Sequence, residues 1–198
     1  MNNKLIYGVG ICNKGKYNAS INRKHTKCYT VWFAMLQRCY SDKYHEKHPT
    51  YIDCQVYKDW LYFQSFAKWY HENYYEIIGQ KMALDKDILC KGNKIYSPET
   101  CIFVPQSINL LFTKTDAKRG ELPIGVSYHK QNKKYQANCN IGNKNRVYLG
   151  LFNTPEEAFS KYKEFKEQYI KEIAEQYKSQ IPVKLYETMI NYTVEFND

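Results

Sequence analysis

The sequence has no apolar run close to the roughly 18 residues that a membrane-spanning helix needs. This absence argues against a protein that crosses a membrane. The first eight residues, Met-Asn-Asn-Lys-Leu-Ile-Tyr-Gly, also lack the apolar core of a secretory signal. We therefore expect the protein to be cytoplasmic.

Several signatures of catalysis and metal binding are absent as well. There is no G-x-x-x-x-G-K-[ST], no G-x-S-x-G and no H-E-x-x-H, so nothing supports a nucleotide-binding P-loop, a serine-hydrolase elbow or a zinc-protease helix. The seven cysteines form no C-x-x-C pair, which argues against a structural zinc site. Their odd number argues against a complete disulfide framework. We expect reduced cysteines that serve as small core hydrophobes.

Positive charge and aromatic rings are abundant instead. The 198 residues carry 29 Lys and Arg against 20 Asp and Glu, and 16% of them are aromatic. Eight Lys and Arg but two acidic residues fall between positions 114 and 150, whereas positions 151–198 hold six Lys against nine Asp and Glu. A basic segment followed by an acidic one predicts a face that binds a polyanion, and it favours nucleic acid as the partner.

Periodicity and turn residues predict the order of the elements. At about 150 residues per domain, the length allows one large domain or two small ones. Asp59 is expected to N-cap a helix that runs to Tyr74, and Thr154-Pro155-Glu156-Glu157 forms a capping box that starts another at 155. The expected helices are 31–40, 60–74, 106–112, 155–177 and 185–192, and the expected strands are 83–89, 101–104, 124–128, 135–141 and 146–151.

A specific pattern runs through the last three strands and the helix that follows. It reads Lys134-Tyr135-Gln136-Ala137, then Tyr148-Leu149-Gly150-Leu151-Phe152, then Thr154-Pro155-Glu156-Glu157-Ala158. This pattern resembles the Apetala/ethylene-response-factor DNA-binding domain over about a quarter of the chain. The resemblance implies a three-stranded antiparallel sheet, packed on an amphipathic helix, that lies in the major groove of duplex DNA.

The candidate DNA-binding residues are the basic and aromatic side chains of this region: Lys118, Arg119, Tyr128, Lys130, Lys133, Lys134, Lys144, Arg146 and Tyr148. The alternative is that the lysines solubilise hairpin turns. Arg146 is the single arginine of the predicted sheet, and arginine is the residue that reads guanine bidentately. We therefore expect weak sequence discrimination from this module.

A second pattern lies upstream. It comprises Leu84-Asp85-Lys86-Asp87-Ile88, Gly92-Asn93-Lys94, Ser97-Pro98-Glu99-Thr100-Cys101 and Asn109. It resembles the ββα-metal half of HNH homing endonucleases, in particular phage-encoded ones that also carry an Apetala-type domain. The stretch from Trp32 to Tyr40 is similar to the helical lead-in of the same family.

This second resemblance implies the roles of the site residues. Asp85 and Asn109 would hold Mg²⁺ or Mn²⁺, because hydrolysis of a phosphodiester needs a hard cation on oxygen ligands. Asn93 would orient the base or the loop. Lys86 stands where the family has its general-base histidine, and a protonated lysine cannot accept a proton. Either burial deprotonates Lys86, or Asp87 substitutes for the base, or the site has lost catalysis.

Together these patterns predict an α+β protein. An HNH-like domain with a helical lead-in would span 1–113, a linker 114–123, and an Apetala-like domain with C-terminal helices 124–198. We expect a metal-dependent endonuclease or nickase of the homing type that acts on double-stranded DNA, in the cytoplasm of the host cell if it is phage-encoded. Two alternatives remain open: a catalytically inactive phage regulator that binds DNA, and a phage inhibitor that binds a host defence protein.

Overall fold

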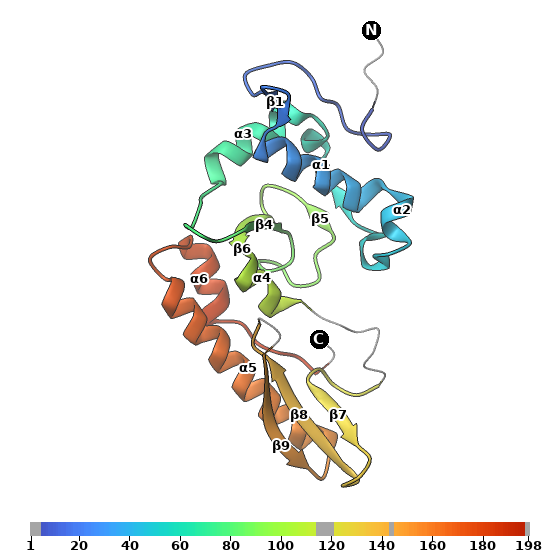
Figure 1. Ribbon diagram of the computed structural model, residues 1–198, viewed down its shortest axis with the longest axis vertical. Coiled ribbons are helices and arrows are strands. Elements are labelled where there is room, and N and C mark those ends of the chain that lie inside the picture. The colour runs from blue at the N-terminus through green and yellow to red at the C-terminus, as the bar shows by residue number, and fades with distance from the viewer. Residues whose placement is uncertain (1–4, 114–120, 143–144, 197–198) are drawn as a thin grey trace. The chain divides into compact units, whose positions relative to one another are not determined.

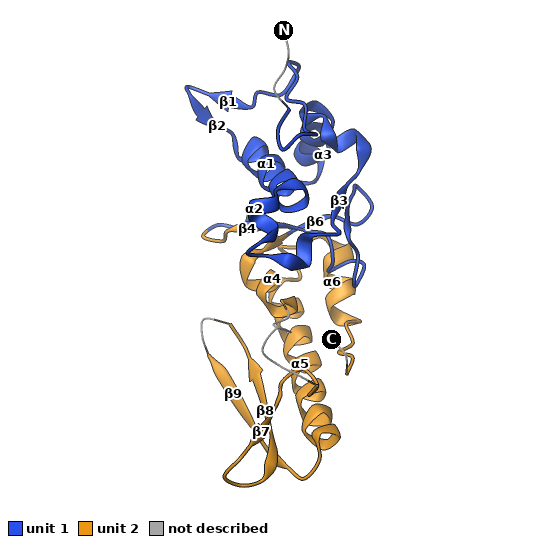
Figure 2. Ribbon diagram, turned by 90° about the vertical axis from the view of Figure 1, so that its right-hand side faces the viewer, with its two compact units in different colours: residues 1–78, 82–103 blue, residues 79–81, 104–198 orange. Residues whose placement is uncertain are grey.

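The structure of the protein is a computed structural model that describes residues 5–113, 121–142 and 145–196. It is a mixed α+β structure that divides into two compact units, 1–78 with 82–103 and 79–81 with 104–198 (Figure 2). Of the expected linker, 114–123, residues 121–123 are described. No helix within the described ranges is both long enough and apolar enough to cross a membrane.

The first unit is built around buried aromatic rings. Helices α1 (Lys27–Tyr40) and α3 (Phe63–Asn73) pack together and contribute to one core. Trp32 and Phe66 in this core are fully shielded from solvent. The Trp32 indole N–H donates to the Trp60 carbonyl at 2.6 Å. The polar group of the buried ring is thereby satisfied, so the ring can lie in the core without an unpaired donor.

Short segments complete the first unit. Strands β1 (Ser20–Ile21) and β2 (Lys24–His25) pair antiparallel, and β3 (Gln55–Val56) pairs in parallel with β5 (Ile95–Tyr96). Strand β4 (Met82–Asp85) pairs with β6 (Ile102–Pro105), which runs into the second unit. The remaining helical turns are α2 (Asp42–His45) and the 3₁₀ helices Pro49–Tyr51 and Lys58–Leu61.

The helix start expected at Asp59 is wrong. Residues Lys58–Leu61 form a 3₁₀ helix, and the α-helix begins at Phe63. The cause is a contact that is distant in sequence: the Ile11 N–H donates to the Leu61 carbonyl, and the Phe63 N–H donates to the Ile11 carbonyl, at 2.8 and 2.9 Å. This bridge holds the chain extended at 61–63, so the helix can start only after it.

The cysteines behave as the composition predicts. All seven are free thiols, and five of them are buried. Burial raises the pKa of Cys28, Cys39 and Cys101 to about 12. These thiols are therefore protonated at neutral pH and pack as small hydrophobic groups.

The second unit contains the three-stranded antiparallel sheet that the sequence predicts. Its strands β7 (Val126–His129), β8 (Lys134–Asn140) and β9 (Arg146–Phe152) lie in the order β7-β8-β9. Figure 1 shows α5 (Pro155–Tyr177) across one face of this sheet. Helix α6 (Val183–Ile190) packs on α5, and α4 (Gln106–Phe112) belongs to the same unit.

The start of α5 is the one that the capping box predicts. The Thr154 hydroxyl accepts the Glu157 N–H at 3.2 Å, and the Glu157 carboxylate accepts the Thr154 N–H at 3.4 Å. Pro155 occupies the first helical position, where no N–H is needed. These signals all lie within four residues, so the sequence is sufficient to set this helix start.

The residue just before β7, Gly125, comes close to α5. This residue has φ +79°, and a Cβ built on it would lie 2.1 Å from a ring carbon of Tyr162 on α5. The next residue, Val126, is buried with Ala137 and Ala158 in the core between sheet and helix. A side chain at 125 would therefore push the sheet away from the helix.

We expect Gly125→Ala to destabilise the protein more than Gly142→Ala does. Gly142 has a similar φ of +91°, but a Cβ there would meet, apart from its chain neighbours, no atom of the described residues within 4 Å. Both substitutions carry the cost of a left-handed alanine, about 1–2 kcal/mol. Gly125→Ala should lose about 1–3 kcal/mol more, the typical cost of overpacking a core. Urea unfolding followed by circular dichroism measures both, and equal losses would contradict the close approach.

Candidate functional site

Asp85 ends β4 and closes the turn that follows it. Its Oδ1 accepts the N–H groups of Asp87 and Ile88, both at 2.7 Å. Because these two N–H groups bond to a side chain, they cannot continue a sheet ladder. The strand expected over 83–89 therefore ends at Asp85.

The Asp85 carboxyl group is in an unusual environment. Burial raises its pKa above the ordinary value, and the two backbone N–H groups act in the opposite direction. Oδ1 is occupied by the turn, whereas Oδ2 has no hydrogen-bond partner among the residues that the structure describes. One oxygen of this half-buried carboxylate therefore remains available to a ligand.

Asn93 holds the two arms of the same loop together. Its amide Nδ2 donates to the carbonyls of Lys86 and Ile95, at 2.8 and 2.7 Å. Its Oδ1 accepts the Ile95 N–H at 3.2 Å. The side chain thus serves the backbone of the loop, in line with a residue that positions its neighbours.

Lys86 lies inside this loop with 6% of its surface exposed. Its ammonium forms an ion pair with Asp87 and donates to the Asn93 carbonyl at 2.8 Å. It also lies 5.9 Å from the ring centre of Tyr96. Two acceptors and a ring face are the environment of a charged ammonium, which is a proton donor and not a base.

Asn109 lies on α4 in the second unit, whereas Asp85, Lys86, Asp87 and Asn93 all belong to the first. The pairing of Asp85 with Asn109 as metal ligands stays a prediction. Within the described ranges, no group of three or more His, Cys, Asp and Glu is placed to hold a metal. A cation at Asp85 would have to complete its shell with amide, backbone, water or phosphate oxygens.

The sheet of the second unit separates the predicted DNA-binding residues into two sets. Paired residues of neighbouring strands point to the same side of a sheet, and successive residues alternate. The face away from α5 carries Lys134, Gln136, Asn140, Arg146 and Tyr148, which we call the outer face. Tyr148 is 57% exposed there.

Tyr128 lies on the other side of the sheet. It is paired with Tyr135, which packs on the core beneath α5, and the two rings meet edge to face at 5.4 Å. Tyr128 therefore serves as a packing partner at the edge of the helix side and does not share the outer face with Tyr148. The alternation of strand residues could have revealed this separation from the sequence.

The other basic candidates lie at a turn or outside the described residues. Lys130 and Lys133 are exposed in the turn between β7 and β8, and Lys133 has φ +49°. Lys118, Arg119 and Lys144 fall outside the residues that the structure describes. The turn end of the outer face is thus basic, with Lys134 next to Lys133.

Arg38 and Tyr96 are connected to Lys86 of this loop through the Tyr96 side chain, and neither is among the site residues predicted from the sequence. The Arg38 guanidinium donates to the Tyr96 hydroxyl at 3.4 Å, and the Tyr96 ring lies against Lys86. Arg38 and Tyr96 are 58 positions apart, so no local pattern connects them.

Comparison of the chain with models of protein families, with curated proteins and with solved structures found no match.

We expect Asp85→Ala and Asp85→Asn to differ in stability. Alanine removes the acceptor of two hydrogen bonds and should cost about 1–3 kcal/mol. Asparagine keeps an acceptor oxygen and removes a half-buried charge, so it should stay within about 0.5 kcal/mol of the natural protein. Urea unfolding at pH 7 measures both. Equal destabilisation of the two variants would show that the charge, and not the acceptor, holds the turn.

Proposed function

We propose that the protein binds duplex DNA through the outer face of its three-stranded sheet and hydrolyses a phosphodiester at Asp85 with a divalent cation. It would act as an HNH-type homing endonuclease or nickase. The observation that carries the proposal is the placement of positive charge at both ends of the outer face.

The outer face has dimensions that suit DNA. Lys134 and Asn140 mark the two ends of β8, and Arg146 is paired with Asn140. Six residues at about 3.3 Å each separate the two cations by about 20 Å along the strand. The major groove is about 12 Å wide, so cations at this spacing can reach phosphates on both sides of it. Tyr148 and Gln136 then face the base edges.

Cleavage is supported by the order of elements and by the free carboxylate oxygen. Asp85 ends β4, which pairs with β6, and α4 follows β6; the two-residue β5 lies between them in the chain and pairs with β3 instead. A pair of strands followed by a helix is the arrangement of the ββα-metal fold. Asp85 Oδ2, with no partner in the described part of the chain, fits an oxygen-liganded cation. Mg²⁺ or Mn²⁺, when bound, neutralises the charge that develops on the phosphate.

A second candidate function is DNA binding without cleavage, in a phage regulator. The position of Lys86 favours it, because an ammonium held by Asp87 and Asn93 is not placed to accept a proton. In that case residues 84–112 keep the fold of a nuclease and supply no general base. Inhibition of a host defence protein is the outcome to pursue if the chain binds no DNA.

We expect Lys134→Gln with Arg146→Gln to weaken DNA binding in a salt-dependent manner. For every phosphate that the variant no longer binds, the slope of log affinity against log salt should become shallower by about one. The matched control is Lys161→Gln with Lys171→Gln on α5, which removes the same charge from the helix across the other face. Fluorescence anisotropy with a duplex between about 50 and 200 mM salt measures the slope. An equal change in the control would contradict binding by the outer face.

We expect the protein to nick supercoiled plasmid with Mg²⁺ or Mn²⁺ and to be inactive with EDTA. Asp85→Asn should abolish nicking and leave DNA affinity within a few-fold, because binding depends mainly on the sheet of the second unit. Asn109→Ala should act similarly but less severely, because a neutral amide binds a cation more weakly than a carboxylate. Tight binding with no nicking in either metal would establish the second candidate function.

A further inference from the structure

Arg38 has no acidic partner among the residues that the structure describes. It lies in the last turn of α1, is partly buried, and donates to the Tyr96 hydroxyl. No carboxylate in the described part of the chain lies within ion-pair distance of its guanidinium. Charged groups that are removed from water are normally paired, so this guanidinium is suited to an anion that the described chain does not supply.

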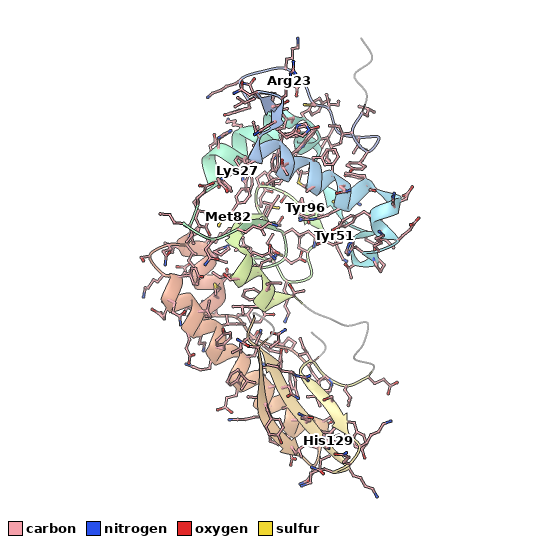
Figure 3. All side chains as sticks on the ribbon, in the orientation of Figure 1. Arg23, Lys27, Tyr51, Met82, Tyr96 and His129 are labelled. Carbon is pink, nitrogen blue, oxygen red and sulfur yellow. The ribbon has the colours of Figure 1, made fainter. Side chains whose placement is uncertain are left out.

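The groups around Arg38 are hydrogen-bond donors. Its electrostatic neighbours are the hydroxyls of Tyr96, Tyr51 and Tyr44. Burial raises the pKa of Tyr51 and of Tyr96, so both keep their protons at neutral pH. The Tyr51 hydroxyl has no hydrogen-bond partner among the described residues. Figure 3 labels both Tyr51 and Tyr96. Tyr96 is buried and accepts from the guanidinium, whereas Tyr51 is only partly buried. A guanidinium beside the hydroxyl proton of Tyr51 is suited to an oxyanion.

The same cluster reaches the loop of Asp85. Lys86 lies over the Tyr96 ring, and its charge also acts on Tyr51. The charge of Lys86 is neutralised by its ion pair with Asp87, whose side chain is 51% exposed. The uncompensated charge is that of Arg38. All of these residues belong to the first unit.

We infer that Arg38, with the hydroxyl of Tyr51, binds one phosphate of the DNA backbone beside the Asp85 loop, while the buried Tyr96 hydroxyl accepts from the guanidinium and holds it in place. A guanidinium presents two parallel N–H groups that match two phosphate oxygens, which a lysine cannot reproduce. The source of the phosphate, a DNA backbone, rests on the proposed function. The site itself rests on the contacts of Arg38.

The test compares Arg38→Gln with Arg23→Gln in the full chain. Arg23 is exposed, lies in the turn between β1 and β2 of the same unit, and is labelled in Figure 3. Both variants lose one positive charge. Arg38→Gln should weaken duplex binding about tenfold and lower the salt slope by about one, whereas Arg23→Gln should change neither as much. Equal effects of the two variants would overturn the inference.

Two further variants keep the test decisive if Arg38→Gln does not fold. Arg38→Lys retains the charge and loses the two parallel donors, so it should still weaken binding several-fold. Tyr51→Phe removes a hydroxyl that makes no hydrogen bond within the described residues, so binding should weaken while the unfolding temperature is kept. If both folded variants bind DNA as the natural protein does, Arg38 does not contact a backbone phosphate.

A separate arm uses inorganic phosphate as the probe. Thermal unfolding is measured in phosphate and in chloride at equal ionic strength, for the natural protein and for Tyr51→Phe and Arg38→Lys.

If the natural chain binds no DNA, the proposed function fails. Stabilisation of the natural protein by phosphate, absent from both variants, would still support the anion site. The absence of such stabilisation in the natural protein would then overturn it. If the variants bind DNA normally but are not stabilised by phosphate, the site takes free phosphate, and the backbone assignment is wrong.

Discussion

Between β4 and β5 the chain forms a loop whose backbone polar groups are satisfied by side chains instead of by a sheet ladder. Asp85 accepts two N–H groups, and Asn93 bridges the two arms through its amide. An unsatisfied buried polar group costs about 1–3 kcal/mol, so these bonds fix the path of the loop. That path places Lys86 against Tyr96, whose hydroxyl meets Arg38. The chemistry proposed at Asp85 and at Arg38 therefore depends on one loop geometry.

In the second unit, packing on one side of the sheet leaves the other side to carry charge. The acidic excess of residues 151–198 lies in the region that contains α5, whereas the outer face carries Lys134 and Arg146. A polyanion is attracted to the basic side and repelled by acidic side chains, so the charge distribution also orients the encounter. Gly125 permits this arrangement because the sheet can approach Tyr162 only without a side chain there.

Local signals were sufficient where the determining contacts are local. The capping box at Thr154 and the three strands of the second unit follow from residues that are neighbours in sequence. The start of α3 could not be predicted, because the bridge to Ile11 decides it. The surroundings of Arg38 could not be predicted either, since the hydroxyl that accepts from it belongs to Tyr96, 58 positions along the chain. The end of β4 depends on which hydrogen bonds the Asp85 side chain makes, which composition does not reveal.

Lys86 is the position where binding and cleavage make different demands. As an ammonium held by Asp87 and the Asn93 carbonyl, it adds positive charge next to Tyr96. Positive charge near a phosphate strengthens binding and favours the charge that develops when the phosphodiester is attacked. A general base needs the opposite property, a lone pair. If the proposed site is active, the base must therefore come from another group, such as Asp87 or a metal-bound water, while Lys86 contributes electrostatically. The loop can then retain its affinity for phosphate whether or not catalysis survives.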